Sequence, residues 1–226
     1  MPSNRGPHPE DPEQFGPDQY ERLRAAVRDL SWLRSRGYSS SRPLRCRASS
    51  PGSRARCSPG AVAGRELHVD AFNVLITVEA ALGGAYLFVG RDTAYRDVDP
   101  LKGTYRIVQQ TDPALALLAD TLSALDLEGI TWHLDDSVSN VGRVKARLRH
   151  VASERGLAWR LVQEDDVDAT LCDVTAPVVT SDSAILDATT AWLHLEALVH
   201  RRHVPSARVV DLRPDGERTS RERGAH

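Results

Sequence analysis

Short apolar runs and longer helical periods alternate between residues 65 and 200. Apolar residues spaced three or four apart predict helices over 113–125 and 141–155. Strands are predicted by the apolar runs at 66–70, 85–90, 130–135, 158–162, 176–182 and 191–195. Such an alternation of strands with helices is typical of an α/β layer structure with a mainly parallel central sheet.

The segments outside this region are more polar. Apolar residues at helical spacing predict an N-terminal helix over 17–38, after a disordered tail at 1–16 that is rich in Pro, Gly and charge. The Ser/Arg/Pro-rich segment 39–64 is interpreted as a linker, with a cationic arm for phosphate backbones and a frameshifted stretch as alternatives. Residues 201–226 form a polar tail, in which 209–212 could add an edge strand.

Composition removes several classes of function. The 226 residues carry a formal net charge of −2, so the whole chain is not a generic polyanion binder. No apolar run reaches the length of a membrane span, and three cysteines are too few for a disulfide framework, so we expect a cytoplasmic protein without a membrane partner. The motifs of P-loop NTPases, dinucleotide-binding enzymes and serine hydrolases are absent from the sequence.

Acidic residues follow four of the predicted strands. The carboxyl ends of parallel strands share one edge of a sheet, and ligands bind there. Carboxylates gathered at that edge repel one another unless a cation lies among them, and hard oxygen ligands favour Mg²⁺ or Mn²⁺. The alternative is that these acids only end strands and cap helices. The strand-end residues are Asp70 and Asn73, Asp135 and Asp136, Glu164 to Asp168, and Ser181 and Asp182.

Three stretches resemble the PIN-like nuclease superfamily, close to its NYN-type members: VDAFNVLITVEAAL (69–82), DDSVSNVGRVKARL (135–148) and VVTSDSAILD (178–187). More narrowly they resemble a branch known only as a domain of unknown function. The resemblance implies a three-layer α/β/α sandwich and a Mg²⁺- or Mn²⁺-dependent phosphodiesterase, most often acting on RNA. It also implies catalytic and metal-binding roles for four acids, with Asn73 orienting the first: Asp70, Asp136, Asp168 and Asp182. Segment 39–64 departs from the branch, which continues there as helix, and the spacing from Asp168 to Asp182 is short.

Basic and polar residues near these acids are candidates for substrate binding. Ser139, Asn140 and Lys145 lie at the start of the helix 141–155, where amide groups and cations could hold a phosphate; a solvated basic face is the alternative. Arg106 could clamp a phosphate from a loop, or form a surface ion pair. His68 and His133 alternate with core positions, which favours packed histidines over metal ligands.

The function predicted from these observations is a divalent-metal-dependent ribonuclease or related phosphodiesterase, with RNA as its partner. The alternative is an inactive nucleic-acid- or nucleotide-binding module on the same scaffold. A hydrolase of the haloacid-dehalogenase type ranks below both, because the first strand reads D-A-F-N where that class needs D-x-D. The sequence leaves the formation of a homodimer open.

Overall fold

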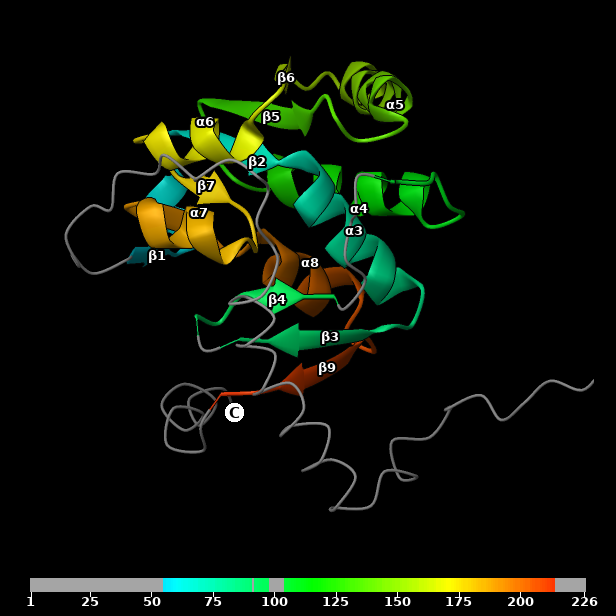
Figure 1. Cartoon of the computed structure of the whole chain (residues 1–226), viewed down its shortest axis with the longest axis vertical. Coiled ribbons are helices and arrows are strands. Elements are labelled where there is room, and N and C mark those ends of the chain that lie inside the picture. The colour runs from blue at the N-terminus through cyan, green and yellow to red at the C-terminus, as the bar shows by residue number, and fades with distance from the viewer. Residues whose placement is uncertain (1–54, 91, 98–103, 214–226) are drawn as a thin grey trace, which may run out of the picture. The chain divides into compact units, whose positions relative to one another are not determined.

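The chain is built around a parallel β-sheet of six strands. A computed structural model describes residues 55–90, 92–97 and 104–213. The strands lie in the order β1-β8-β7-β2-β5-β6, and every neighbouring pair is parallel (Figure 1). Their bounds are β1 Ala55–Cys57, β2 Glu66–Asp70, β5 Gly129–Asp135, β6 Trp159–Glu164, β7 Val178–Val179 and β8 Ala191–Leu193.

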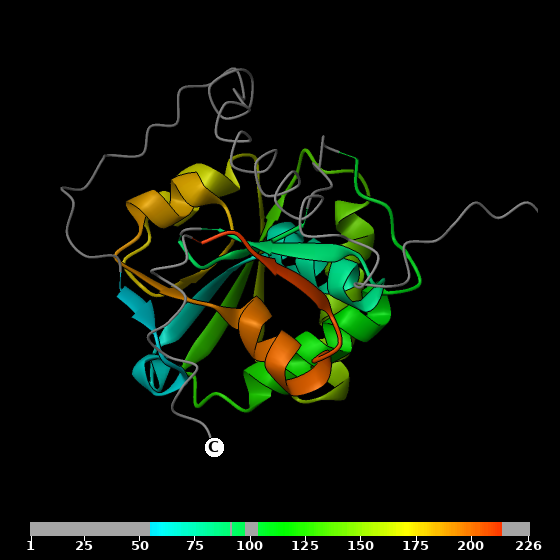
Figure 2. The same ribbon diagram turned by 90° about the horizontal axis from the view of Figure 1, so that it is seen from below.

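Helices cover both faces of this sheet, which confirms the predicted three-layer α/β/α architecture (Figure 2). One face packs against α3 Ala71–Leu82, α4 Thr111–Ser123, α5 Val141–Glu154 and α8 Leu195–His203. The other face packs against α6 Val167–Asp173 and α7 Ser183–Ala188, whose buried residues meet β7. A short 3₁₀ helix, η2 Pro59–Val62, follows β1.

The main core follows from the alternation of side chains along β2 and β5. Leu67 and Val69 point to the face covered by α3, α4, α5 and α8, and they are completely buried there. Trp132 and Leu134 do the same from β5. The intervening residues of β2, among them His68 and Asp70, therefore face the side covered by α6 and α7. The polar side chains of His68 and Asp70 thus lie on the side of the sheet that the two short helices α6 and α7 cover.

A second, smaller sheet has the order β4-β3-β9. Strand β3 Tyr86–Val89 pairs antiparallel with β4 Tyr95–Arg96 and parallel with β9 Arg208–Asp211. The predicted edge strand of the C-terminal tail is therefore found, although it belongs to this smaller sheet. Strand β1 and η2 lie within the segment interpreted as a linker, so the described part of that segment has regular structure.

The remaining predictions about the ends of the chain lie outside the described residues. These are the disordered tail at 1–16, the N-terminal helical extension at 17–38, most of the linker and the last residues of the tail. Within the described residues, no helix combines the length and apolarity that a membrane crossing requires.

Candidate carboxylate site at the sheet edge

Three of the four predicted acids lie where a strand gives way to a helix. Asp70 is the last residue of β2 and the N-cap of α3. Asp168 lies in the first turn of α6, and Asp182 is the N-cap of α7. Parallel strands end at a common edge, so these positions bring the acids to the same side of the sheet.

Asp70 is the most buried of these acids. Its Oδ2 atom accepts a hydrogen bond of 2.9 Å from the hydroxyl group of Thr180, and its Oδ1 atom accepts one of 3.5 Å from the backbone amide of Asn73. Burial and the negative charges of Asp168 and Asp182 raise the pKa of Asp70, the hydrogen bonds from Thr180 and Asn73 lower it, and the net result is a pKa of about 7. A carboxyl group that titrates near neutral pH is therefore held among other carboxylates.

Asp168 shows the same effect to a smaller degree. Burial raises the pKa of its carboxyl group to about 6, and the charges of Asp182, Asp166 and Asp135 contribute in that order. Asp168 and Asp182 therefore act electrostatically on Asp70, and Asp182 acts on Asp168. The structure brings these three predicted residues together.

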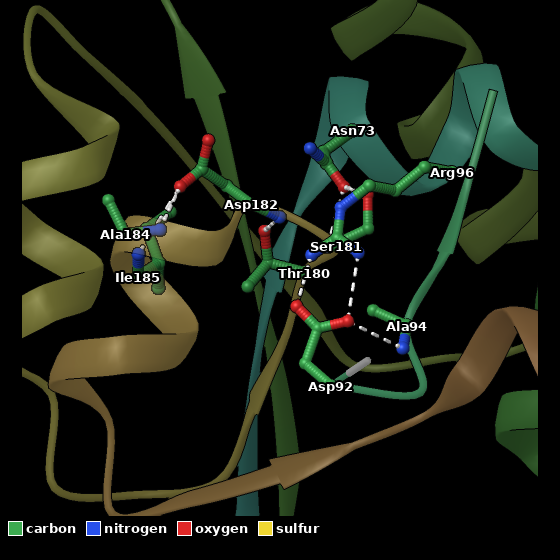
Figure 3. A network of polar contacts seen from close by, with 9 residues as sticks. All are labelled: Asn73, Asp92, Ala94, Arg96, Thr180, Ser181, Asp182, Ala184 and Ile185. Carbon is green, nitrogen blue, oxygen red and sulfur yellow. Dashed lines mark hydrogen bonds and ion pairs between the residues drawn. The ribbon is translucent and has the colours of Figure 1, made fainter. Parts of the chain in front are cut away.

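The residues Thr180 and Ser181 connect Asp182 with α3 (Figure 3). Asn73 accepts two hydrogen bonds through its Oδ1 atom, from the backbone amide of Ser181 at 2.7 Å and from its hydroxyl group at 2.6 Å. Asp182 uses Oδ1 to accept from the amides of Ala184 at 2.6 Å and Ile185 at 3.3 Å. Asn73 therefore contacts Asp70 through its backbone and orients Ser181 through its side chain.

The fourth predicted acid, Asp136, is placed differently. It is exposed in the turn after β5, where its carboxyl group accepts a hydrogen bond from Gln163. Its charge is not among those that raise the pKa of Asp70 or Asp168, whereas the charge of Asp135 acts on Asp168. The structure therefore associates Asp135, rather than Asp136, with the carboxylate group.

The other predicted substrate-binding residues, Ser139, Asn140, Lys145 and Arg106, differ in their surroundings. Ser139 and Asn140 donate hydrogen bonds of 3.1 and 2.8 Å to the backbone carbonyl of Tyr105, so they hold the loop before α4. Lys145 donates to Gln163 at 3.3 Å, close to the end of β6. Arg106 is exposed in the loop that precedes α4.

A partly buried chain of hydrogen bonds links β2, β5, β6 and α6. His68 Nδ1 and His133 Nε2 share a hydrogen bond of 2.8 Å, and His133 Nδ1 lies 2.5 Å from Glu164 Oε1. Thr170 of α6 donates to the other oxygen of Glu164 at 2.7 Å. The sequence predicted packed histidines, but their mutual contact depends on the register of β2 against β5, which no local pattern reveals. Glu164 consequently ties α6, and Asp168 with it, to the sheet.

Sequence reasoning also missed Glu79 as a buried acid. Its Oε1 atom accepts hydrogen bonds of 2.5 Å from the hydroxyl groups of both Tyr105 and Thr111. Burial raises the pKa of Glu79, while the bonds from Thr111 and Tyr105 lower it. Glu79 thus links α3 to the loop that Ser139 and Asn140 hold.

The ligand atoms available at the site are carboxylate oxygens, which suit a hard cation. The acids do not, however, surround a metal ion completely. In the described part of the chain, no three His, Cys, Asp or Glu side chains converge closely enough to hold a metal ion by themselves. Mg²⁺ is usually held by one or two carboxylates and keeps several water molecules. Carboxylate oxygens could hold such a partly hydrated Mg²⁺ or Mn²⁺ ion, and the described residues form no closed structural metal site.

Comparisons with known proteins agree with the extent of this fold. Residues 59–198 match the family model described as "Domain of unknown function (DUF5616)". The chain is also similar to "Uncharacterized protein MJ0935" of Methanocaldococcus jannaschii, with 29% identity over 123 residues. That alignment covers 54% of this chain and 58% of the archaeal protein. No solved structure matches the chain.

Proposed function

The chain belongs to the DUF5616 family, and we propose that it is a divalent-metal-dependent phosphodiesterase acting on RNA, as its resemblance to PIN-like nucleases implies. The observation that carries the proposal is the electrostatic coupling of Asp70 with Asp168 and Asp182 at the carboxyl edge of a parallel sheet. A purely structural strand end does not require two other acids to raise the pKa of a buried carboxyl group such as that of Asp70. A bound cation would remove the repulsion that this arrangement creates.

One or two carboxylates of the group Asp70, Asp168 and Asp182 would hold a Mg²⁺ or Mn²⁺ ion that keeps several water molecules. When bound, such a cation supplies charge stabilisation for a phosphate and lowers the pKa of a water molecule. Thr180 orients Asp70 by donating to one of its oxygens. The amides of α7 bind Oδ1 of Asp182, which fixes the direction of the carboxyl group. Burial and the neighbouring charges raise the pKa of Asp70 to about 7.

The basic face of α5 supports RNA as the substrate class. Arg143 and Arg149 are exposed on this helix, and Lys145 lies near the end of β6. Arg147 is engaged with Asp112 at 2.8 Å and contributes less free charge. Contacts to a phosphate backbone come mainly from Arg and Lys, so binding should weaken steeply as the salt concentration rises.

One observation favours a second candidate function. The absence of a three-ligand group among the described residues is what an inactive binding module on the same scaffold would show. Such a module would bind RNA or a nucleotide through α5 without cleaving it. The two candidates share their fold and their basic surface, and they differ in the requirement for a cation.

Cleavage of labelled single-stranded RNA in the presence of Mn²⁺, Mg²⁺ or a chelator separates these functions. The proposal predicts cleavage with either cation and none with the chelator. Asp182→Asn should abolish cleavage while RNA binding survives. Asp120→Asn is the matched control, because Asp120 is half-exposed and paired with Arg155 on the opposite layer. RNA binding without cleavage under all conditions would instead support the binding module.

A further inference from the structure

The start of α8 contains a buried carboxyl group that lacks a partner. Glu196 is 3% exposed, and neither of its carboxyl oxygens has a hydrogen-bond partner within the described part of the chain. The Nε2 atom of His194, two residues earlier, is likewise buried and unpartnered there. Buried polar side chains almost always have a partner, so these two groups require a physical explanation.

The two groups differ in how burial affects them. Burial raises the pKa of Glu196 to about 7, and the nearby cation Arg96 of β4 opposes that rise. Burial and, to a smaller degree, the positive charges of Arg56 and Arg201 together lower the pKa of His194 to about 3. Near neutral pH, therefore, Glu196 changes its charge while His194 stays neutral.

Among the described residues, the helices that pack against α8 offer Glu196 no unengaged ionic partner. The charged side chains of α3 and α4 are engaged in hydrogen bonds or ion pairs of their own. On α8 itself, His200 Nδ1 contacts the hydroxyl group of Tyr95 at 3.5 Å. The engaged pairs of α3 and α4 are Glu79 with Tyr105, Asp112 with Arg147, and Asp120 with Arg155.

Arg96 is held by another carboxylate. Its two terminal nitrogens donate to the two oxygens of Asp92, at 2.9 and 2.5 Å (Figure 3). This pair closes tightly over Gly90, where an added Cβ atom would lie 2.5 Å from Nη1 of Arg96. Within the same turn, Ala94 packs against Leu186 of α7 and Trp192 of β8. The position of the turn is therefore coupled to α7.

We propose that Arg96 is shared between two carboxylates: Asp92 holds it while Glu196 carries a proton, and Glu196 competes for it once that proton has left. The proton goes to solvent, and the guanidinium group gains a buried acceptor in exchange for a partly exposed one. The turn of Asp92 and Ala94 then moves against Leu186. Because α7 begins at the cap residue Asp182, this exchange makes the candidate carboxylate site sensitive to pH.

A ¹³C NMR titration of the Glu196 carboxyl group in the full chain tests this proposal. Wild type should titrate near pH 7. Asp92→Asn releases Arg96, so the midpoint should fall by at least about one pH unit, the effect of a neighbouring arginine on a carboxyl group. Arg96→Gln should raise the midpoint. Asp120→Asn is the control, and it should leave the midpoint where it is. An unchanged midpoint in Asp92→Asn, or an ordinary carboxyl titration in wild type, would overturn the proposal.

A second measurement applies if the Asp92 variant does not fold. The backbone amide signals of Ala94 and Leu186 should shift between pH 6 and pH 8 in wild type. Glu196→Gln preserves the shape of the side chain and removes its titration, so these shifts should vanish in that variant. Amide shifts that persist in Glu196→Gln would show that another group moves the turn.

Discussion

Asp70→Asn should stabilise the protein above neutral pH. In the folded chain, burial first, and then the charges of Asp168 and Asp182, raise the pKa of Asp70 from an ordinary 3.8 to about 7. Each pKa unit corresponds to about 1.4 kcal/mol, so keeping this group ionised costs about 4 kcal/mol of folding free energy. Asparagine carries no charge, and its single carbonyl oxygen can still accept a hydrogen bond from Thr180 or from the amide of Asn73.

The direction of the pKa shift determines how the free energy of unfolding changes with pH. A carboxyl group whose pKa is raised on folding contributes full stability below pH 3.8, and it loses that contribution as the pH rises to about 7. Wild type should therefore lose stability across this window, and the variant should lose less. The free energies of unfolding of the two proteins should diverge by up to about 4 kcal/mol at pH 8 and converge near pH 4.

Urea unfolding of wild type and Asp70→Asn at several pH values, without divalent cations, measures this difference. Asp120→Asn serves as the control for the loss of one exposed acid. A variant that is less stable than wild type at pH 8, or whose stability follows pH with the same slope, would refute the reasoning. Either result would mean that Asp70 does not bear the charge repulsion inferred from the structure.

Three other variants test separate parts of the molecule. Asp182→Asn keeps a residue able to cap α7, so it should fold normally but lose most of the gain in melting temperature that Mn²⁺ gives wild type in a thermal-shift assay. Tyr105→Phe removes a buried 2.5 Å hydrogen bond to Glu79, and chemical denaturation should show a loss of about 1–3 kcal/mol. Leu118→Ala empties a fully buried position on α4 and should cost about 2–5 kcal/mol in the same assay, whereas a loss below about 1 kcal/mol would place Leu118 outside the core.

The layered fold could be predicted because its signals are local. The apolar run at 158–162 predicted β6, and the periodic segment 113–125 predicted α4, each within two or three residues of the observed bounds. The strand-end positions of Asp70 and Asp182 followed from the same runs. A strand also emerged at Ala55–Cys57, where its pairing with β8 outweighs a sequence with few apolar residues.

The sequence could predict only those site residues whose location follows from their position at the end of a strand. Asp135 and Asp136 are adjacent, and the pleat of β5 determines which carboxylate acts on Asp168. The contact of His68 with His133 depends on strand register, and the burial of Glu79 depends on a loop 26 residues away. Such contacts between distant segments leave no periodic signal in the sequence.

The central claim is that Asp70, Asp168 and Asp182 form a site for a divalent cation. Isothermal titration calorimetry of Mn²⁺ into the protein at pH 6.5 tests it most directly. Asp70 titrates near pH 7, so a bound cation should displace a proton, and the measured heat should depend on the ionisation enthalpy of the buffer. Asp120→Asn should behave like wild type, and Asp70→Asn should bind more weakly and release fewer protons. A wild-type protein that shows no binding of Mn²⁺ or Mg²⁺, or that binds without releasing protons, would contradict the account.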